Sequence, residues 1–307
     1  MDKVSIIDMG SNSIRLLLAE LNDGKLVGAE KLLRMTRLGA GVDQDGVLRQ
    51  DTMDATIEAI LEFKNLAADG GYVLLGAFAT SAVREAGNGE AFAKRVERET
   101  GVTVEVVSGD EEAALGFQGV LAGLARPGRV LVIDIGGGSA ELILGDPGGI
   151  FKKVSLPMGA VRMTERWLKS DPPAAQEMES LRADVLAQLE PWRYFAADFQ
   201  PAAAVGIGGT ATTLGAIELE MEAYDRERIQ GFELSAQALD RMILRLAGMT
   251  LDYRRQVPGL QPKRADIIVA GALVLETILK FFDMNGYSVS DYDNLEGLLV
   301  SKGYLKL

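Results

Sequence analysis

The pattern of hydrophobic positions opens twice in the same way along this chain. Apolar runs at Val4–Ile7 and Val130–Ile133 are each followed by a turn and by two further strand-like runs, the last of them at Lys25–Lys31 and Gly149–Leu156. Short apolar runs bounded by turn residues are typical of β-strands. Each half of the chain is therefore predicted to begin as a meander of three consecutive strands.

The two openings are also related in sequence. The segment Asp8–Leu18 aligns without a gap with Asp134–Leu144, and an Asp, a Gly, a Ser and two Leu positions coincide. Self-similarity of this kind indicates a structural unit that occurs more than once. We therefore expect two halves built on the same plan.

Helices and further strands follow each meander. The first half predicts a helix over Asp51–Ala68 with Asp51 as its N-cap, a strand over Tyr72–Ala79, a helix over Glu90–Glu99, a strand over Val102–Val107 and a helix from Gly109. The second half predicts helices over Pro173–Trp192 and Arg264–Phe282 and strands over Ala202–Gly206 and Tyr287–Val289.

Mixed sheets covered by helices, built twice, predict an α/β fold with a cleft between two domains. The run Arg126-Pro127-Gly128 punctuates the chain between the halves. We therefore expect an N-terminal domain over residues 1–125 and a C-terminal domain over residues 126–307, with the final helix able to pack back on the first domain.

Composition narrows the chemistry. The 307 residues include no cysteine and no histidine, which excludes disulfides, thiol nucleophiles and imidazole bases. A formal net charge of −12 argues against nucleic-acid binding through a general basic surface. The longest apolar run, Ile267–Leu275, is too short to cross a bilayer, and the N-terminus lacks the pattern of a signal peptide. We expect no membrane span and a cytoplasmic location.

The repeated segments place an aspartate, Asp8 or Asp134, at the end of a buried strand and before a turn of small residues. These turns are Gly10-Ser11-Asn12-Ser13 and Gly136-Gly137-Gly138-Ser139. Backbone N–H groups in such turns can point at an anion, while the aspartate can hold a hydrated Mg²⁺ against phosphate oxygens. Two loops of this kind would grip a phosphate chain from both sides. The alternative is that both are ordinary hairpin turns whose glycines only satisfy turn geometry.

A third glycine-rich turn, Gly206-Ile207-Gly208-Gly209-Thr210-Ala211, is predicted to follow a strand and to open a helix. Taken alone it matches the dinucleotide fingerprint, but it occurs late in the second half rather than on the first strand of a βαβ unit. A helix N-terminus with free amides suits any phosphate, so we interpret Gly208, Gly209 and Thr210 as a third wall of the same cleft. No Walker A pattern follows either Asp-containing loop.

Two further segments lie where a strand turns into a helix. In Ser108-Gly109-Asp110-Glu111-Glu112, Ser108 and Glu111 fit a capping box, whereas capping does not require Glu112. Glu112 is therefore a candidate general base for an attacking water. In Thr80-Ser81-Ala82-Val83-Arg84, Ser81 is a candidate cap and the planar fork of Arg84 can hold two phosphate oxygens, although many surface arginines have no such role.

Together these residues resemble the exopolyphosphatase / guanosine pentaphosphate phosphohydrolase (Ppx/GppA) family of the actin-like ATPase superfamily. The matching segments span nearly the whole chain, at residues 7–13, 79–86, 108–113, 133–142, 206–214 and 264–268. The resemblance implies two ribonuclease H-like domains with mixed sheets, the α/β fold class expected above.

The resemblance also implies site residues. It makes Glu112 the catalytic base and Arg84 a phosphate contact, and it places Asp134, Gly136, Ser139 and Glu141 at the phosphate and metal site opposite Asp8 and Ser13. Two positions depart from the family pattern: Ala140 replaces a usual Thr, and Leu295 stands where an arginine is usual before Glu-Gly. The additional C-terminal helical domains of longer members are not matched, which by analogy argues against a long polyphosphate channel and leaves shorter chains or a nucleotide open as substrates.

The expected activity is in-line attack of water on a terminal phosphoryl group, with Mg²⁺ or another divalent cation as cofactor, held by Asp8, Asp134 and Glu141. The substrate is inorganic polyphosphate, guanosine pentaphosphate or both, and the family comparison implies a homodimer. Two alternatives stay open: an ATP-dependent kinase or ATPase of the same superfamily, and a non-catalytic sensor of guanosine tetra- or pentaphosphate.

Overall fold

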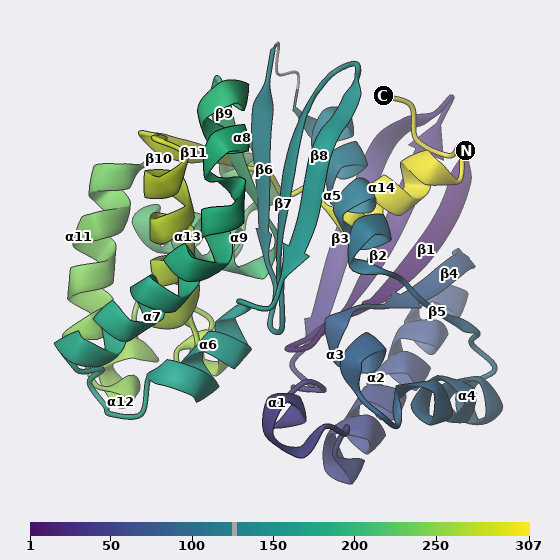
Figure 1. The fold of residues 1–307 in the computed structure, drawn as a ribbon. Helices are drawn as coiled ribbons and strands as arrows, with labels where there is room; N and C mark the ends of the chain where they lie inside the picture. Colours follow the sequence, from purple (N-terminus) through teal and green to yellow (C-terminus); the bar gives the residue numbers. More distant parts are fainter. Residues whose placement is uncertain (125–127) are drawn as a thin grey trace. The chain divides into compact units, whose positions relative to one another are not determined.

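The computed structural model describes residues 1–124 and 128–307. This part of the chain forms two compact units, one made of Met1–Ala122 and Asn294–Leu307 and the other of Gly123–Asp293 (Figure 1). The predicted boundary between residues 125 and 126, with Arg126 and Pro127, lies outside the described residues. The predicted cleft between the domains stays a prediction.

The first unit alternates strands and helices after an initial meander. Its elements are β1 (Asp2–Met9), β2 (Ile14–Asn22), β3 (Lys25–Arg34), α1 (Val42–Asp45), α2 (Gln50–Asp69), β4 (Val73–Ala79), α3 (Ser81–Glu85), α4 (Gly89–Thr100), β5 (Val104–Val106), α5 (Gly109–Gly123) and α14 (Asn294–Ser301).

The strands of the first unit form a sheet in the order β3-β2-β1-β4-β5. The β1–β2 and β2–β3 pairs are antiparallel, whereas β1–β4 and β4–β5 are parallel. Both faces of β1 are covered: Ile7 and Met9 belong to the core cluster that includes buried residues of α2, while Val4 and Ile6 alternate to the other face. Helix α14 packs against β1.

The second unit repeats the plan with longer helices. Its elements are β6 (Val130–Ile135), β7 (Ala140–Asp146), β8 (Gly149–Leu156), α6 (Ala160–Trp167), α7 (Ala175–Leu189), the 3₁₀ helix η1 (Glu190–Trp192), α8 (Arg193–Phe199), β9 (Ala203–Ile207), α9 (Gly208–Glu218), α10 (Arg226–Ile229), β10 (Glu233–Ser235), α11 (Ala236–Ala247), α12 (Leu251–Arg254), the 3₁₀ helix η2 (Pro262–Arg264), α13 (Ile268–Phe281) and β11 (Gly286–Val289).

The sheet of the second unit has the order β10-β11-β9-β6-β7-β8. Read from β8, the order β8-β7-β6-β9-β11 matches β3-β2-β1-β4-β5 of the first unit, with the same antiparallel and parallel pairs. Only β10, antiparallel to β11, is added among the described strands. The predicted fold class is confirmed: an α/β protein of two ribonuclease H-like domains with mixed sheets.

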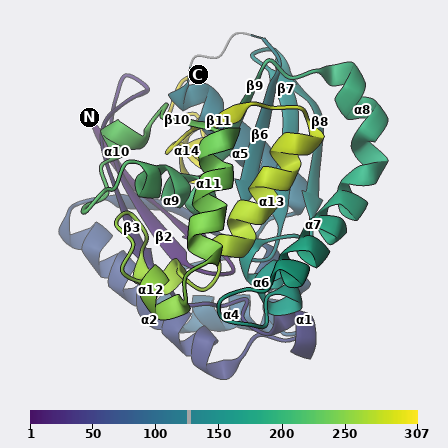
Figure 2. The ribbon, with the colours of Figure 1, turned by 90° about the vertical axis from the view of Figure 1, so that its left-hand side faces the viewer.

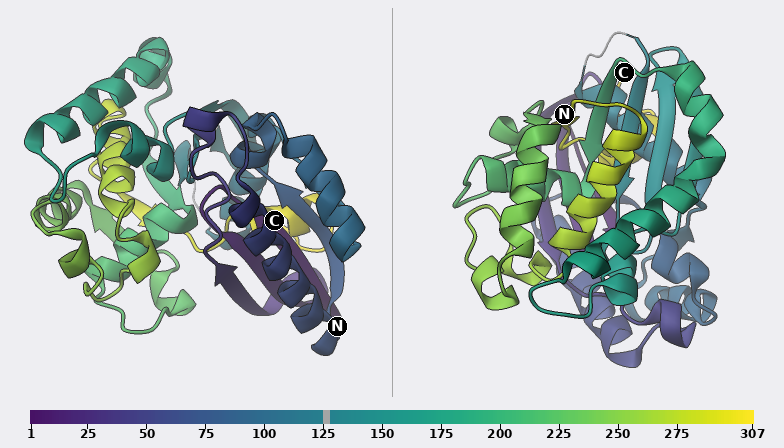
Figure 3. Two further views of the ribbon diagram at one scale, coloured as in Figure 1. Left: turned by 90° about the horizontal axis from the view of Figure 1, so that it is seen from below. Right: turned by 60° about the vertical axis from the view of Figure 1, so that its left-hand side comes forward.

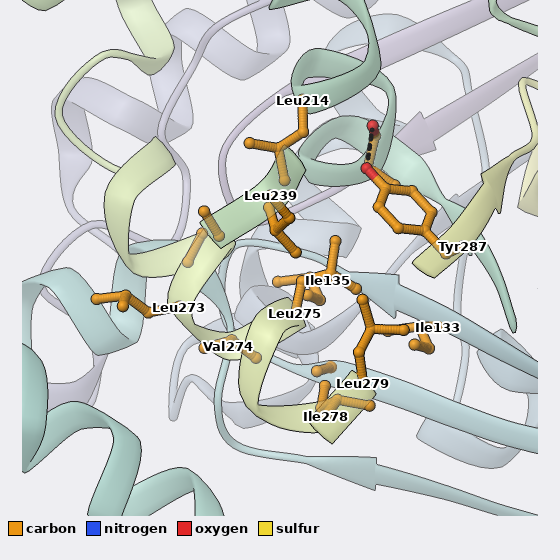
Figure 4. Packing of buried hydrophobic residues seen from close by; sticks show 14 of the residues in the cluster. Ile133, Ile135, Leu214, Leu239, Leu273, Val274, Leu275, Ile278, Leu279 and Tyr287 are labelled. Carbon is orange, nitrogen blue, oxygen red and sulfur yellow. Dashed lines mark hydrogen bonds between the residues drawn. The ribbon is translucent and has the colours of Figure 1, made fainter. Parts of the chain in front are cut away.

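Helix α13 is the centre of the core in the second unit. Figure 2 and the right-hand view of Figure 3 show it between α11 and α7. Every residue from Ile268 to Leu279 is buried, including Glu276, which pairs with Arg182 of α7. Leu273, Leu275 and Leu279 belong to one cluster with Ile133 and Ile135 of β6 (Figure 4). A helix that is apolar all round belongs inside a core.

Two predicted caps are wrong, although the helices they belong to are present. Helix α2 begins at Gln50 with Arg49 at the N-cap, so Asp51 lies in the first turn, where its charge complements the helix dipole. Ser81 is the first residue of α3, after Thr80 at the N-cap, and its hydroxyl shares a hydrogen bond with Ser11 Oγ. Both errors are shifts of one or two residues at helix starts, which local sequence determines least well.

Replacement of Leu273 by alanine tests the central role of α13. Leu273 is fully buried in the described structure, whereas Leu244 on α11 is 72% exposed. We expect Leu273→Ala to lower the free energy of unfolding by about 3 kcal/mol, and Leu244→Ala to change it by less than about 0.5 kcal/mol. Urea denaturation of both variants gives the comparison, and equal effects would contradict this account of the core.

Candidate functional site

The first Asp-containing loop is a tight turn between β1 and β2. Gly10 N–H donates to the Ser13 carbonyl at 3.0 Å, and the strand register places Asp8 directly opposite Arg15. The buried Asp8 carboxylate accepts a hydrogen bond from Arg15 Nε at 2.9 Å and a second from Arg15 NH2. The first loop therefore combines its aspartate with a guanidinium, which sequence reasoning did not single out.

The second loop repeats this backbone geometry with different chemistry. Gly136 N–H donates to the Ser139 carbonyl, again at 3.0 Å, and the register places Asp134 opposite Glu141. Both carboxylates are buried. The hydroxyls of Ser139 and Ser155 donate to Glu141 Oε1 at 2.8 and 2.7 Å. At the repeat position where the first unit has Arg15, the second unit thus has a second carboxylate.

A later segment of the same unit supports the first loop from behind. The backbone N–H groups of Arg37 and Gly39 donate to the carbonyls of Asn12 and Ser11, at 3.0 and 2.8 Å. A Cβ atom at residue 39 would lie 2.8 Å from Ser11 Cβ, so only glycine fits there. These bonds fix the carbonyls of the loop.

The start of α6 supports the second loop in the same manner. Ala160 N–H donates to the Gly136 carbonyl at 2.8 Å, and Val161 N–H donates to the Gly137 carbonyl at 2.9 Å. A Cβ atom at residue 159 would lie 2.4 Å from the backbone of Gly137, so glycine is required at the contact. Because α6 binds these carbonyls, they cannot turn towards an anion, and the loop presents its other face.

The third glycine-rich turn lies beside the second loop, and its place as a third wall of a cleft stays a prediction. Gly208 opens α9 with φ of +72°, and a Cβ atom there would lie 2.2 Å from Asp134 Oδ1. The N-terminus of α9, a favourable end for an anion, therefore starts beside the Asp134 carboxylate. Thr210 Oγ1 donates to the Ile135 carbonyl at 2.9 Å, so its hydroxyl joins α9 to the end of β6.

A tyrosine from β11 holds the first turn of α9 from the other side. The Tyr287 hydroxyl donates to the Ala211 carbonyl at 3.1 Å, the dashed line in Figure 4. Burial raises the pKa of Tyr287, so the phenol stays protonated and remains a donor.

Arg264 is a buried arginine beside the third turn that sequence reasoning did not place there. The pair Lys263-Arg264 resembles a solvated basic patch, but Arg264 is only 8% exposed. A Cβ atom at Gly209 would lie 2.2 Å from Arg264 NH1, so the guanidinium rests against the start of α9. Glycine at position 209 signals that something approaches closely, but the sequence does not say which side chain does so.

Glu112 and Arg84, two predicted site residues, form an ion pair in the first unit. Arg84 NH1 donates to Glu112 Oε2 at 3.1 Å and to the Val107 carbonyl at 2.9 Å. Glu112 is 7% exposed. The ion pair with Arg84 holds the buried carboxylate in one position, which suits a general base beside a phosphate contact.

The predicted capping box next to Glu112 is confirmed. Ser108 N–H and Ser108 Oγ both donate to Glu111 Oε2 at 2.8 Å, and Glu111 N–H donates to Ser108 Oγ at 3.2 Å. Capping therefore accounts for Glu111, and Glu112 is left for another role.

The side-chain amide of Asn12, in the first loop, has a buried acceptor oxygen. Its Nδ2 makes a long contact of 4.0 Å with Met35 Sδ, while its buried Oδ1 has no hydrogen-bond partner in the part of the chain that the structure describes. A carbonyl oxygen attracts a donor rather than a phosphate oxygen. A phosphate contact by Asn12, which stays a prediction, would therefore use its Nδ2 donors, beside the backbone amides of the loop and the hydroxyls of Ser11 and Ser13.

The carboxylates fit a magnesium ion only as a partial ligand set. No group of three or more Asp and Glu side chains that could hold a metal occurs within residues 1–124 and 128–307. Mg²⁺ commonly keeps several waters and binds one or two carboxylates together with substrate phosphates. The opposed pair Asp134 and Glu141 fits that mode, whereas Asp8 is already paired with Arg15.

The predicted residues thus fall into two groups, one in each unit. Asp8, the loop Gly10–Ser13, Arg84 and Glu112 belong to the first unit, and Asp134, Glu141, the loop Gly136–Ser139 and the turn Gly208–Thr210 to the second. That both groups bind one substrate stays a prediction, as do the individual roles.

The fold and the two matching loops define the class of protein, a two-domain α/β protein with a duplicated turn at the end of a strand. Residues 18–304 match the Ppx/GppA phosphatase family, and the chain belongs to this family. No helix in the described ranges is long and apolar enough to span a membrane.

Relatives of known name cover most of the chain. Exopolyphosphatase 2 of Mycobacterium tuberculosis is 34% identical over 313 residues, with 97% of this chain and 98% of the relative covered. The bifunctional 3-dehydroquinate synthase/phosphatase of Fusobacterium nucleatum is 32% identical over 96% of this chain, which spans 46% of that protein. The guanosine-5'-triphosphate,3'-diphosphate pyrophosphatase of Vibrio vulnificus is 28% identical over 95% of this chain, which spans 57% of that protein.

The fold is also similar to a solved member of the family. The crystal structure of the Aquifex aeolicus Ppx/GppA family member superposes with a TM-score of 0.82, at 32% identity and with 98% of this chain and 97% of that chain covered.

Replacement of Gly159 by alanine tests the support of the second loop by α6. The added methyl group would meet the Gly137 backbone, whereas the nearest atom to a Cβ at Gly28 on β3 lies at an ordinary 3.6 Å. We expect Gly159→Ala to lower the free energy of unfolding by about 1–3 kcal/mol, and Gly28→Ala to change it by less than about 1 kcal/mol. Similar denaturation midpoints for the two variants would refute the tight contact.

Proposed function

We propose that this chain is a phosphohydrolase that releases terminal orthophosphate from inorganic polyphosphate, from guanosine pentaphosphate or from both. Membership of the Ppx/GppA phosphatase family supports a phosphatase. One relative is named an exopolyphosphatase and another a guanosine-5'-triphosphate,3'-diphosphate pyrophosphatase. These names support the two proposed substrates. The structural observation that carries the proposal is the ion pair between the buried Glu112 carboxylate and the partly buried Arg84.

Glu112 is assigned as the general base that orients a water molecule and accepts its proton. Its carboxylate is buried, lies in the first turn of α5 and is not needed for capping, because Glu111 already fills that role. Arg84 holds the carboxylate in one orientation through NH1. In an in-line displacement, a positioned carboxylate beside the attacking water contributes by orienting it and removing its proton.

The amides of the loops and the arginines are assigned to the phosphate groups. The two turns share one backbone geometry, and α9 adds a helix N-terminus with Arg264 resting on it. Phosphoryl transfer passes through a loose transition state whose charge spreads over the phosphoryl oxygens. Donors aimed at that charge, rather than covalent chemistry, therefore account for most of the expected acceleration.

Mg²⁺ is the proposed cofactor, with Asp134 and Glu141 as the residues that would hold it. When bound, the ion would neutralise charge on the phosphate oxygens. The seryl hydroxyls of Ser139 and Ser155 keep Glu141 oriented by their bonds to Oε1. Asp8 stays a predicted magnesium ligand, and its ion pair with Arg15 competes with binding of the metal.

Partners and location follow from charge and from the family resemblance. The charge of −12 supports a protein that does not bind nucleic acid. A cytoplasmic homodimer that does not associate with membranes is proposed from the family resemblance and from the absence of a membrane-length helix among the described residues. Sedimentation of the purified chain measures the oligomeric state.

Parallel phosphate-release assays test the proposed activity. The purified protein with Mg²⁺ receives short polyphosphate, long polyphosphate, guanosine pentaphosphate or ATP. Release from one or more of the first three supports the hydrolase and identifies its substrate. Activity with ATP alone would identify a kinase or ATPase instead, and tight binding of guanosine pentaphosphate without release would identify a sensor.

Replacement of Glu112 by glutamine tests the general base. We expect kcat to fall by about 10² to 10⁴ with little change in KM, because glutamine keeps the shape but cannot accept the proton. The neighbouring variant Glu111→Gln is the matched control: it weakens the capping box by about 0.5–1 kcal/mol and keeps kcat. Equal losses of kcat in the two variants would rule out a special role for Glu112.

Replacement of Asp134 by asparagine tests the metal assignment. We expect the Mg²⁺ concentration for half-maximal activity to rise by about 10-fold or more, since one of two carboxylates is lost. Asp146, the last residue of β7, is the control position, because its Oδ1 accepts a hydrogen bond from Gly148 N–H. An unchanged magnesium dependence in Asp134→Asn, or the same shift in Asp146→Asn, would contradict the assignment.

A further inference from the structure

Arg254 is a buried charged residue that the proposed reaction does not use directly. It ends the short helix α12, and only 4% of its surface is exposed. A buried guanidinium is costly unless its N–H groups are paired, and an apolar side chain of similar size often serves stability as well. The burial of a charge here therefore indicates a role in positioning.

The partners of Arg254 show what it positions. NH1 donates to the Ala265 carbonyl at 3.1 Å, and NH2 donates to Asp171 Oδ1 at 2.8 Å. Ala265 follows Arg264 in the chain and is fully buried. The bond to its carbonyl ties the turn that carries Arg264 to α12.

Asp171 also holds the Arg254 guanidinium in place. Both Asp171 carboxylate oxygens accept the Leu251 N–H, which is the first of α12, each at 2.9 Å. The same carboxylate thus caps the start of α12 and pairs with the arginine at its end. Asp171 therefore fixes the Arg254 guanidinium, and Arg254 in turn fixes the peptide group that follows Arg264.

The turn itself places the Arg264 side chain at the start of α9. Arg264 N–H donates to the Gln261 carbonyl at 2.8 Å, and Ile267 N–H donates to the Arg264 carbonyl at 3.1 Å, so the turn behaves as one piece. Its guanidinium lies against Gly209. A shift of the turn would move the guanidinium away from the helix N-terminus.

We infer that Arg254 is a positioning residue that acts on the phosphate site through Arg264. The inference rests on the proposed function, because it takes Arg264 as a phosphate contact. Arg254 itself reaches no reacting group in this scheme. Its neighbour Arg255 offers a matched control, since its side chain is 50% exposed and pairs with Asp252, three residues earlier on the same turn.

A double-mutant cycle on phosphate release tests the link, with inorganic tripolyphosphate and Mg²⁺ as the probe. We expect Arg254→Met to lower kcat/KM by about 10-fold or more, as misplacement of a contact group does. In the Arg264→Ala background the same change should lower it by less than about 2-fold, because the group it positions is already gone. Arg255→Met should have no effect in either background.

Equal losses in the two backgrounds, or no loss from Arg254→Met, would overturn the inference. An Arg264→Ala variant with full activity would also overturn it and would remove Arg264 from the proposed site, while phosphate release by the parent protein would still stand. If Arg254→Met does not fold, Asp171→Asn takes its place, with a smaller effect in the same direction expected because one charge of the pair is lost.

Hydrogen exchange gives a readout that does not depend on activity. We expect faster exchange of the amides of residues 264–267 in Arg254→Met, and unchanged exchange in the middle of α13. Unchanged exchange of the turn would overturn the positioning role, whether or not the protein releases phosphate. Failure of the parent protein to release phosphate would separately refute the proposed function.

Discussion

The turn that reverses the chain after a buried, aspartate-ending strand is the constraint on which this structure depends. In both units a glycine N–H closes the turn on a serine carbonyl three residues later, at 3.0 Å. The bond brings the next strand back antiparallel and sets the register, so residue 15 lies opposite Asp8 and residue 141 opposite Asp134. The two cross-strand pairs at the strand ends follow from that register.

The two units share a backbone plan but carry different charges on it. At the same place in the repeat, Arg15 neutralises Asp8, whereas Glu141 adds a second carboxylate beside Asp134. In the proposed scheme the first unit supplies the base Glu112, and the carboxylate pair of the second unit holds the cation beside its own phosphate contacts. Conservation of the fold with divergence of one side chain explains how a duplicated domain can serve two chemical roles.

The sequence predicted most of the fold because the determining signals are local. The meanders, the capping box of Ser108 and Glu111, and the helix opened at Gly208 all depend on neighbouring residues. The sequence could not predict that Arg264 is buried against Gly209, or that Gly159 contacts the second loop, because these contacts join distant segments. Local charge patterns alone suggest a solvated Arg264.

The most direct test of the central claim is hydrolysis in water enriched in ¹⁸O, followed by mass spectrometry of the released orthophosphate. Attack of water on the terminal phosphoryl group, as Glu112 is proposed to direct it, predicts one ¹⁸O atom in each orthophosphate from a single turnover and none in the remaining phosphate chain. Label in the remaining chain would place the attack on another phosphorus atom. Absence of label from both products, or transfer of the phosphoryl group to a different acceptor, would contradict a hydrolase.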